Sequence, residues 1–424
     1  MKTRFRTFFV VTTLAVLLTA GFWFLARASA PVVAAQVRPP ATIVIGTPIA
    51  KMAPLETTMF NTGFQPFNKV WDPQQGLGPV FTQDQCTICH SDPGGVAGGN
   101  STQKVEFVGK FNTDGTYNDL STSPNEGGPQ IQPMSVQKFK PACILKGEVK
   151  PADATIDAFH QAPQLFGLGL IDNIADADIL AQAVDKGMGV HGNANMVLDE
   201  NGVLRPGRFG LKAQAADLIF MTANAELHEL GVTNAIFPNE DKPQGQSFPP
   251  ACSIKTQPND VNATQMIDMY HYLLYLAPKI PGTPNPNGQA KFMSVGCVLC
   301  HLQSYKTTAT VTVQVAYKGQ TIQSTSLANK TVKLYSDLLL HDLGGSNADG
   351  LQVGIATGSQ FRTAPLWGLS TRLSTGNGLM HDGSAKDIPT ALSKHGGEAT
   401  QVIANFNALS AQDQADLIAF ISAL

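Results

Sequence analysis

Cys86-Thr87-Ile88-Cys89-His90 and Cys297-Val298-Leu299-Cys300-His301 are two copies of one pattern, Cys-x-x-Cys-His, in a chain with only six cysteines. The pattern is typical of c-type haem attachment: two thiols form thioethers with the haem vinyl groups, and the histidine becomes the fifth ligand of the iron. A pair of zinc or redox Cys-x-x-Cys sites is the alternative. A structural zinc site has four protein ligands, whereas each copy supplies three. We therefore predict two covalently bound haem c groups, with His90 and His301 as iron ligands.

The composition excludes one class of partner. The chain has 424 residues, enough for two or three domains, and 43% of them are hydrophobic. Only 14% are charged, well below the usual quarter. This balance, with 39 glycines and 27 prolines, fits buried bulky cofactors and long loops. A nucleic-acid partner is not expected, because such binders cluster Lys and Arg.

The first 35 residues resemble an export signal. Lys2, Arg4 and Arg6 precede an uncharged run at 8–26, which fits a secretory signal or an uncleaved anchor that just reaches spanning length. We favour cleavage after Ala35, which leaves 25 basic against 32 acidic side chains, a net charge of −7. The predicted location is periplasmic, with membrane contact only through this segment if it is retained. The acidic balance is compatible with a basic electron donor.

Two cysteines remain outside the haem motifs. Cys143 and Cys252 lie in similar contexts, Pro-Ala-Cys-Ile-Leu-Lys and Pro-Ala-Cys-Ser-Ile-Lys. In an oxidising compartment we expect them to form a disulfide. It would close a loop of about 110 residues, worth ~4–5 kcal/mol on the chain-entropy model. Two free buried thiols are the alternative.

The order of segments predicts a mainly α fold with two cytochrome c-like haem domains, long loops and a small β-hairpin insertion. The Pro-rich residues 36–60 are expected to form a linker arm, 61–280 the first haem domain and 289–424 the second, with a boundary in the Pro/Gly-rich segment 281–288. Residues 91–135 are expected to be loop. Alternation at 307–315 and a turn at 317–320 predict the hairpin. Helical spacing occurs at 152–160, 176–187, 211–230, 263–277 and after a predicted N-cap at Ser410.

Several segments together resemble the di-haem oxidoreductase family, the relatives of bacterial dihaem cytochrome c peroxidases. The resemblance extends over about residues 60–424. It is carried by Gly-Leu-Gly-Pro-Val-Phe (76–81), Leu-Phe-Gly-Leu-Gly-Leu-Ile (165–171), Gly-Arg-Phe-Gly (207–210), Phe-Arg-Thr-Ala-Pro-Leu-Trp-Gly-Leu (361–369), His-Asp-Gly (381–383) and His-Gly-Gly-Glu-Ala (395–399). It implies two c-type haems, electron transfer and a peroxidase-like activity.

The resemblance also implies a sixth ligand for the second haem. In the related peroxidases this ligand is a methionine fourteen residues after the histidine of His-Asp-Gly. Counting from His381 gives His395, so the second haem is expected to be bis-histidine, which lowers its potential relative to His/Met ligation. Met380 is the competing ligand, and a loop role for His395 is the alternative. For the first haem the candidates are Met134, His160 and His191, or an open distal face.

Two positions depart from the family pattern. The relatives carry a tryptophan between the haems where this chain has Leu211, and a glutamine on the peroxide-binding side where it has Met221. Neither replacement can serve as an aromatic hopping site or move a proton. Glu229 is the remaining candidate for the acid/base, because cleavage of an O–O bond needs a proton carrier within hydrogen-bond reach. A solvated helix face is the alternative for Glu229.

Other residues are candidates for supporting roles. Arg208 and Arg362 are plausible propionate partners, Trp367 is expected to pack against the second haem, and His341 to orient a propionate or a neighbouring ligand. A calcium ion is a further candidate cofactor, but the matching positions, Gly376 and Gly378, offer only backbone oxygens.

The sequence therefore predicts an exported dihaem c-type cytochrome, an electron-transfer oxidoreductase with peroxidase-like activity. The alternative is a non-catalytic electron carrier in which both irons are six-coordinate. The expected partners are a soluble or membrane-bound electron donor and, for the enzyme, a small-molecule oxidant.

Overall fold

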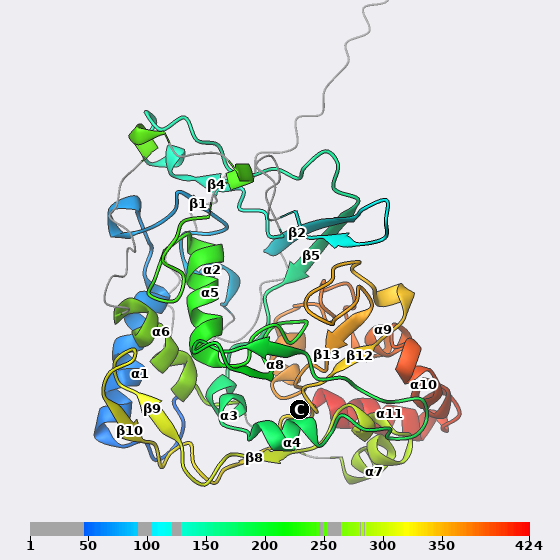
Figure 1. Ribbon diagram of the computed structural model, residues 1–424. Helices are drawn as coiled ribbons and strands as arrows, with labels where there is room; N and C mark the ends of the chain where they lie inside the picture. Colours follow the sequence, from blue (N-terminus) through cyan, green and yellow to red (C-terminus); the bar gives the residue numbers. More distant parts are fainter. Residues whose placement is uncertain are drawn as a thin grey trace, which may run out of the picture. The chain divides into compact units, whose positions relative to one another are not determined.

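The computed structural model describes residues 46–91, 103–120, 129–241, 243–245, 249–252, 264–279, 281–283 and 285–424 (Figure 1). All of these residues belong to one compact unit, residues 43–424. The expected signal or anchor at 1–35 lies outside the described residues. The division into haem domains at 61–280 and 289–424 stays a prediction.

The α-helices are distributed along the whole described chain. They are α1 (Pro54–Asn68), α2 (Cys86–Cys89), α3 (Leu168–Asp172), α4 (Asp176–Leu180), α5 (Leu218–Leu230), α6 (Thr264–Tyr275), α7 (Pro286–Ser294), α8 (Leu369–Ser374), α9 (Ile388–Ser393), α10 (Thr400–Asn407) and α11 (Ala411–Ser422). Within the described part of the chain, no helix combines the length and the apolar character that a bilayer crossing requires.

The strands form small antiparallel sheets. One has three strands in the order β3-β2-β5, and the others are the pairs β1-β4, β6-β7, β8-β11, β9-β10 and β12-β13. The strands are β1 (Val80–Phe81), β2 (Lys104–Phe111), β3 (Tyr117–Asn118), β4 (Met134–Ser135), β5 (Ile156–Gln161), β6 (Met196–Leu198), β7 (Leu204–Pro206), β8 (Tyr305–Lys306), β9 (Thr312–Gln314), β10 (Thr321–Gln323), β11 (Thr331–Val332), β12 (Leu340–Asp342) and β13 (Gln360–Arg362).

The prediction of a mainly α fold built of cytochrome c-like domains is wrong. Over the residues that the structure describes, 33% are helical and 16% are in strands, which form several small sheets. The segment 152–160, predicted to be helical, overlaps β5, which runs one residue further. Strand β5 pairs with β2 (Lys104↔Gln161 to Gly109↔Ile156), and β2 lies inside the segment expected to be loop. The physical reason is non-local: β2 contributes the buried residues Val105 and Val108 to the paired sheet, and β-propensity depends on such cross-strand packing.

Helices α1 and α6 lie side by side and form the centre of the largest core (Figure 1). Three phenylalanines of α1 surround the ring of Tyr272 in α6, with centroid distances of 5.1 to 5.3 Å; they are Phe60, Phe64 and Phe67. Gly63 allows this approach, because a Cβ there would lie 2.0 Å from the carbonyl oxygen of Asp268. Helix α1 begins inside the range 36–60 assigned to a linker arm.

A second core covers the C-terminal part. Helices α7 and α11 pack together, and Phe292 of α7 contacts Phe420 of α11 edge-on at 5.4 Å between centroids (Figure 1). Two predictions for this part are confirmed. Ser410 caps α11 by accepting a hydrogen bond from the amide of Asp413, and β9 and β10 form the hairpin.

The predicted disulfide is confirmed. Cys143 and Cys252 are bonded, with their Cα atoms 4.7 Å apart and a sequence separation of 109. Both are buried in a cluster with Trp71, Phe81 and Val136. The bond therefore ties two distant loops to the core that also contacts the first Cys-x-x-Cys-His copy through Cys86.

Candidate functional site

The second Cys-x-x-Cys-His copy follows directly after α7. Cys297–Leu299 form one turn of 3₁₀ helix. The preceding residue, Gly296, has a φ of 105°, a left-handed backbone conformation that glycine adopts readily. The Nδ1 atom of His301 lies 2.9 Å from the carbonyl oxygen of Tyr335. A carbonyl can only accept, so Nδ1 carries the proton and Nε2 is left as a ligand atom. Burial lowers the pKa of His301 to about 4, so the ring is neutral at pH 7, the form that binds a metal.

The two cysteines of the first copy are the first and last residues of α2, and His90 is the C-cap residue that follows this helix. Burial lowers the pKa of His90 to about 4, although an interaction with the backbone of Pro163 acts in the opposite direction. Each copy thus presents a neutral histidine, but only the Nδ1 atom of His301 bonds to a carbonyl oxygen, whereas the buried Nδ1 atom of His90 has no hydrogen-bond partner among the described residues. The four cysteines of the two copies form no disulfides.

A cavity of about 290 Å³ lies beside the second copy. Its wall includes the cysteines of that copy and His301, together with both sixth-ligand candidates, Met380 and His395. The Nδ1 atom of His395 lies 2.7 Å from the carbonyl oxygen of Ala391, so its Nε2 atom is also left as a ligand atom. Burial lowers the pKa of His395. The structure therefore brings two neutral imidazoles, His301 and His395, to one cavity.

Two arginines also line this cavity. The Nε atom of Arg362 donates to the carbonyl oxygen of Gly210 at 2.9 Å, and that of Arg372 donates to Gly378 at 2.8 Å. Burial lowers the pKa of each guanidinium to about 10. Within the described part of the chain neither arginine forms an ion pair. Because cations removed from water are normally paired, these two partly buried guanidinium groups fit an acidic group in the cavity, such as a haem propionate.

Arg208, the other predicted propionate partner, is already engaged by the protein. Its side chain is fully buried, pairs with Asp176 and donates to the carbonyl oxygen of Ile174 at 2.7 Å. It lines the cavity, but its charge is balanced by a carboxylate of the chain itself.

The comparison with protein families agrees with this geometry. Residues 144–424 match the family model described as "Di-haem oxidoreductase, putative peroxidase". The chain belongs to the di-haem oxidoreductase family. No curated protein and no solved structure matches it. The matched residues of this di-haem oxidoreductase contain the second copy and His395, whereas the first copy precedes them.

In this di-haem oxidoreductase the first copy lies near two carboxylates of α5. Burial raises the pKa of Cys86 to about 12, and the charges of Glu226 and Glu229 add to this effect. Burial raises the pKa of Glu229 as well, while hydrogen bonds from Gln130 and Thr82 lower it. Glu229 is therefore not on a solvated helix face; it lies beside the first attachment site as a partly buried carboxyl.

The three sixth-ligand candidates for the first haem have different surroundings. The Nε2 atom of His160 pairs with Asp349 at 2.9 Å, and the side chain of His191 is 60% exposed. Met134 packs against the same buried cluster as Cys86. Of the three candidates, Met134 is the one that shares a cluster with the first copy.

The two expected departures from the family pattern, Leu211 and Met221, lie in different surroundings. Leu211 and Trp367 both line the cavity of the second copy, and Trp367 is almost fully buried. A Cβ on Gly167 would lie 2.5 Å from the Trp367 ring, so the indole packs tightly on the segment that follows Pro163. Met221 is partly buried against the main core.

Sequence reasoning missed an ionic network beside Cys300. His341 was named, but its partners are Asp337, at 2.8 Å from Nε2, and Glu398, at 2.8 Å from Nδ1. Lys186 pairs with Asp337 at 2.6 Å. The His341 Nδ1 atom also lies 3.5 Å from the sulfur of Cys300. The members are separated by up to 212 positions in the chain, so no local pattern could group them.

The predicted calcium position is a poor fit. The carbonyl oxygen of Gly378 accepts hydrogen bonds from Arg372, at 2.8 Å, and from Gln161, at 3.3 Å. A carbonyl that faces a guanidinium is not available to a hard cation, which prefers several oxygen ligands.

Proposed function

We propose that this di-haem oxidoreductase is an exported c-type cytochrome that carries two covalently attached haems and transfers electrons between them. The observation that carries the proposal is the placement of His301 and His395 on one cavity, each with Nδ1 bonded to a carbonyl. Two imidazoles with free Nε2 atoms are the ligand set of a bis-histidine iron. The attachment residues are Cys86, Cys89, His90, Cys297, Cys300 and His301.

Each residue set has a defined task toward the haems. When bound, the haems supply centres for one-electron redox chemistry. The paired cysteines fix the ring edge, His301 and His395 bind the metal, and Arg362 and Arg372 balance the propionate charge. The ionic network beside Cys300 pairs two cations with two carboxylates, so it adds no net charge next to the second haem.

Peroxidase-like chemistry at the first haem depends on Glu229. A carboxyl with a raised pKa near the attachment site can hold a proton and release it to a leaving oxygen. The alternative function, a non-catalytic electron carrier, is favoured by Leu211 and Met221, since neither side chain moves a proton or an electron. The sixth ligand of the first haem decides between them, because an open face admits an oxidant.

The remaining parts of the proposal concern location and partners. The basic and apolar start of the chain supports export to the periplasm, with the segment cleaved or kept as an anchor. A soluble or membrane-bound protein is proposed as the electron donor, and a small molecule such as peroxide as the oxidant. Calcium is not part of the proposed function, since Gly378 faces Arg372.

The test uses mature protein exported from a host that attaches haem. A pyridine haemochrome assay is expected to give two haems per chain, and one in the Cys86→Ser/Cys89→Ser variant. A ratio of one or less in the wild-type protein would refute the proposal. The optical spectrum of half-reduced protein then separates the two functions: a high-spin signal that shifts with peroxide supports the enzyme, and low-spin spectra that ignore peroxide support the carrier.

A further inference from the structure

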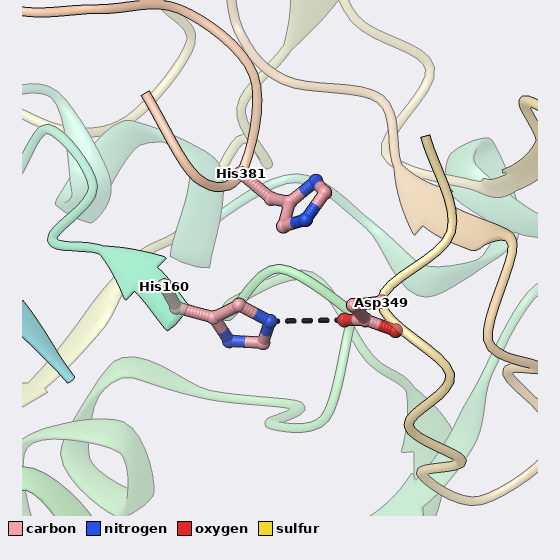
Figure 2. A group of neighbouring side chains, drawn as sticks. All are labelled: His160, Asp349 and His381. Atoms are coloured by element: carbon pink, nitrogen blue, oxygen red, sulfur yellow. Dashed lines mark hydrogen bonds and ion pairs between the residues drawn. The ribbon is translucent and has the colours of Figure 1, made fainter. Parts of the chain in front are cut away.

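A cluster of three side chains at the edge of the second copy's cavity has the composition of a metal site. His160 extends from β5, while Asp349 and His381 come from two separate loops (Figure 2). One ligand atom from each of the three lies within 4.8 Å of the others. The Nε2 atom of His160 is already 2.9 Å from the Asp349 carboxylate, as Figure 2 shows. We propose that His160, Asp349 and His381 bind one divalent ion of the zinc type.

The ligand types select the kind of metal. Two imidazoles and one carboxylate suit zinc and neighbouring transition metals, whereas calcium and magnesium require oxygen ligands. Zinc bonds of about 2.0–2.1 Å in a tetrahedron place ligand atoms about 3.3 Å apart. The His160–Asp349 separation is close to this value, so only His381 has to move, by an ångström or two. The fourth position would be taken by water.

The surroundings hold the three groups in place. The other oxygen of Asp349 lies 2.9 Å from the Lys212 ammonium, which is itself held by the carbonyl oxygens of Thr357 and Gln360. The His381 ring stacks on Phe361 at a centroid distance of 4.5 Å and an angle of 15°. Metal-binding carboxylates and imidazoles usually have such neighbours, because these fix the orientation of the ligand.

In the described part of the chain, His381 has an unpaired ring nitrogen and a neutral ring, as expected of a residue that binds a metal. Its Nδ1 atom is buried and has no hydrogen-bond partner among the described residues. Burial, together with the charge of His160, lowers the pKa of His381 to about 4, so the ring is neutral and needs no deprotonation to bind a metal. The Lys212 charge opposes a cation. We therefore expect weaker binding than at a closed four-ligand site, and the experiment uses micromolar zinc.

Zinc would join β5 to the loop that carries Met380 and His381. His381 lines the cavity of the second copy, so the ion would sit at the edge of that cavity and stabilise its wall. The proposal does not depend on the proposed redox function, because zinc is not redox-active and its ligands are neither attachment residues nor His395.

The test is zinc binding by the full, haem-loaded chain. After treatment with chelator, wild-type protein is equilibrated with micromolar zinc chloride, and zinc and iron are counted by elemental mass spectrometry. We expect one zinc per chain in the wild type and in the control His191→Gln, and at least tenfold weaker binding in His160→Gln and His381→Gln. Zinc K-edge absorption should show two imidazole ligands.

Two results would overturn the proposal: no zinc bound by the wild type, or equal binding by the cluster variants, which would leave an ion-pair cluster only. If the variants fold poorly, as judged by the Soret spectrum, the wild type still decides. Zinc should then protect His160 and His381, but not His191, from diethyl pyrocarbonate, and a lack of protection would count against the site.

Discussion

His301 and His395 line one cavity, and the Nδ1 atom of each bonds to a backbone carbonyl, at 2.9 and 2.7 Å respectively. The two histidines use carbonyl groups from different parts of the chain. His301 uses a carbonyl 34 residues later in the chain, whereas His395 uses one in its own helical turn. Both rings therefore carry their proton on Nδ1 and leave Nε2 unprotonated. This is the tautomer in which both Nε2 atoms can bind one metal.

The first prediction concerns His395. Replacement by alanine removes one of the two axial ligands, so the second haem should change from low spin to high spin. Optical and electron paramagnetic resonance spectra of the oxidised protein measure this change. Met380→Leu is the matched control, because Met380 lines the same cavity and should leave the spectrum unchanged. A low-spin His395→Ala protein would exclude His395 as a ligand.

The second prediction concerns Glu229. If the first haem reacts with peroxide, Glu229→Gln should lower kcat by about 100-fold or more, since a positioned acid/base contributes that much, with KM little changed. Glu226→Gln is the control, one turn earlier on α5 and also close to Cys86. An equal loss in both variants would mean that charge near the haem matters and proton transfer by Glu229 does not.

The third prediction is a pH dependence from His341. Burial alone would lower its pKa, but hydrogen bonds to Asp337, Cys300 and Glu398 raise it to about 11. A pKa raised on folding contributes stability that is complete below the unfolded value of about 6.5 and is lost as pH rises toward the folded value. The Tm of the wild type should therefore fall between pH 7 and 10.

The variant His341→Gln tests this assignment. It should be destabilised by about 3 kcal/mol at pH 6, because the buried carboxylate of Asp337 loses one of its two cationic partners and keeps only Lys186. Its Tm should also fall less steeply between pH 7 and 10 than that of the wild type or of His191→Gln. Parallel curves for all three proteins would show that His341 is not the titrating group.

The parts of the fold that the sequence predicted correctly are those with local determinants. The Ser410 cap and the hairpin at β9 and β10 depend on residues within a few positions of each other. The strand β5 was predicted to be a helix because its pairing partner, β2, lies about 50 positions earlier. Nothing inside 152–160 specifies that pairing.

The same division holds for the site. The attachment motifs could be found by spacing and His395 by the resemblance to the related peroxidases, and both His301 and His395 line one cavity. The contacts of His341 with Glu398, and of His160 with Asp349, join segments 57 and 189 positions apart. Such pairs form through tertiary packing, which a single sequence does not encode in any local pattern.

The fourth prediction concerns the disulfide. The double variant Cys143→Ala/Cys252→Ala opens a link with a sequence separation of 109 and should lose ~4–5 kcal/mol of stability on the chain-entropy model. Denaturant unfolding followed by the haem absorbance measures the loss, and the haem content should stay at the wild-type value. An unchanged midpoint would show that the link does not constrain the unfolded chain.

The fifth prediction concerns the contact between α1 and α6. A Cβ on Gly63 would lie 2.0 Å from the carbonyl oxygen of Asp268 and 2.8 Å from the amide nitrogen of Tyr272. Both are backbone atoms of α6, so Gly63→Ala must separate the helices. Such overpacking costs about 3 kcal/mol, and it should be visible as a lower denaturant midpoint. Asn61→Ala, at an exposed position of the same helix, should change it by less than about 0.5 kcal/mol. Equal midpoints for the two variants would mean that the close approach at Gly63 does not hold α1 against α6.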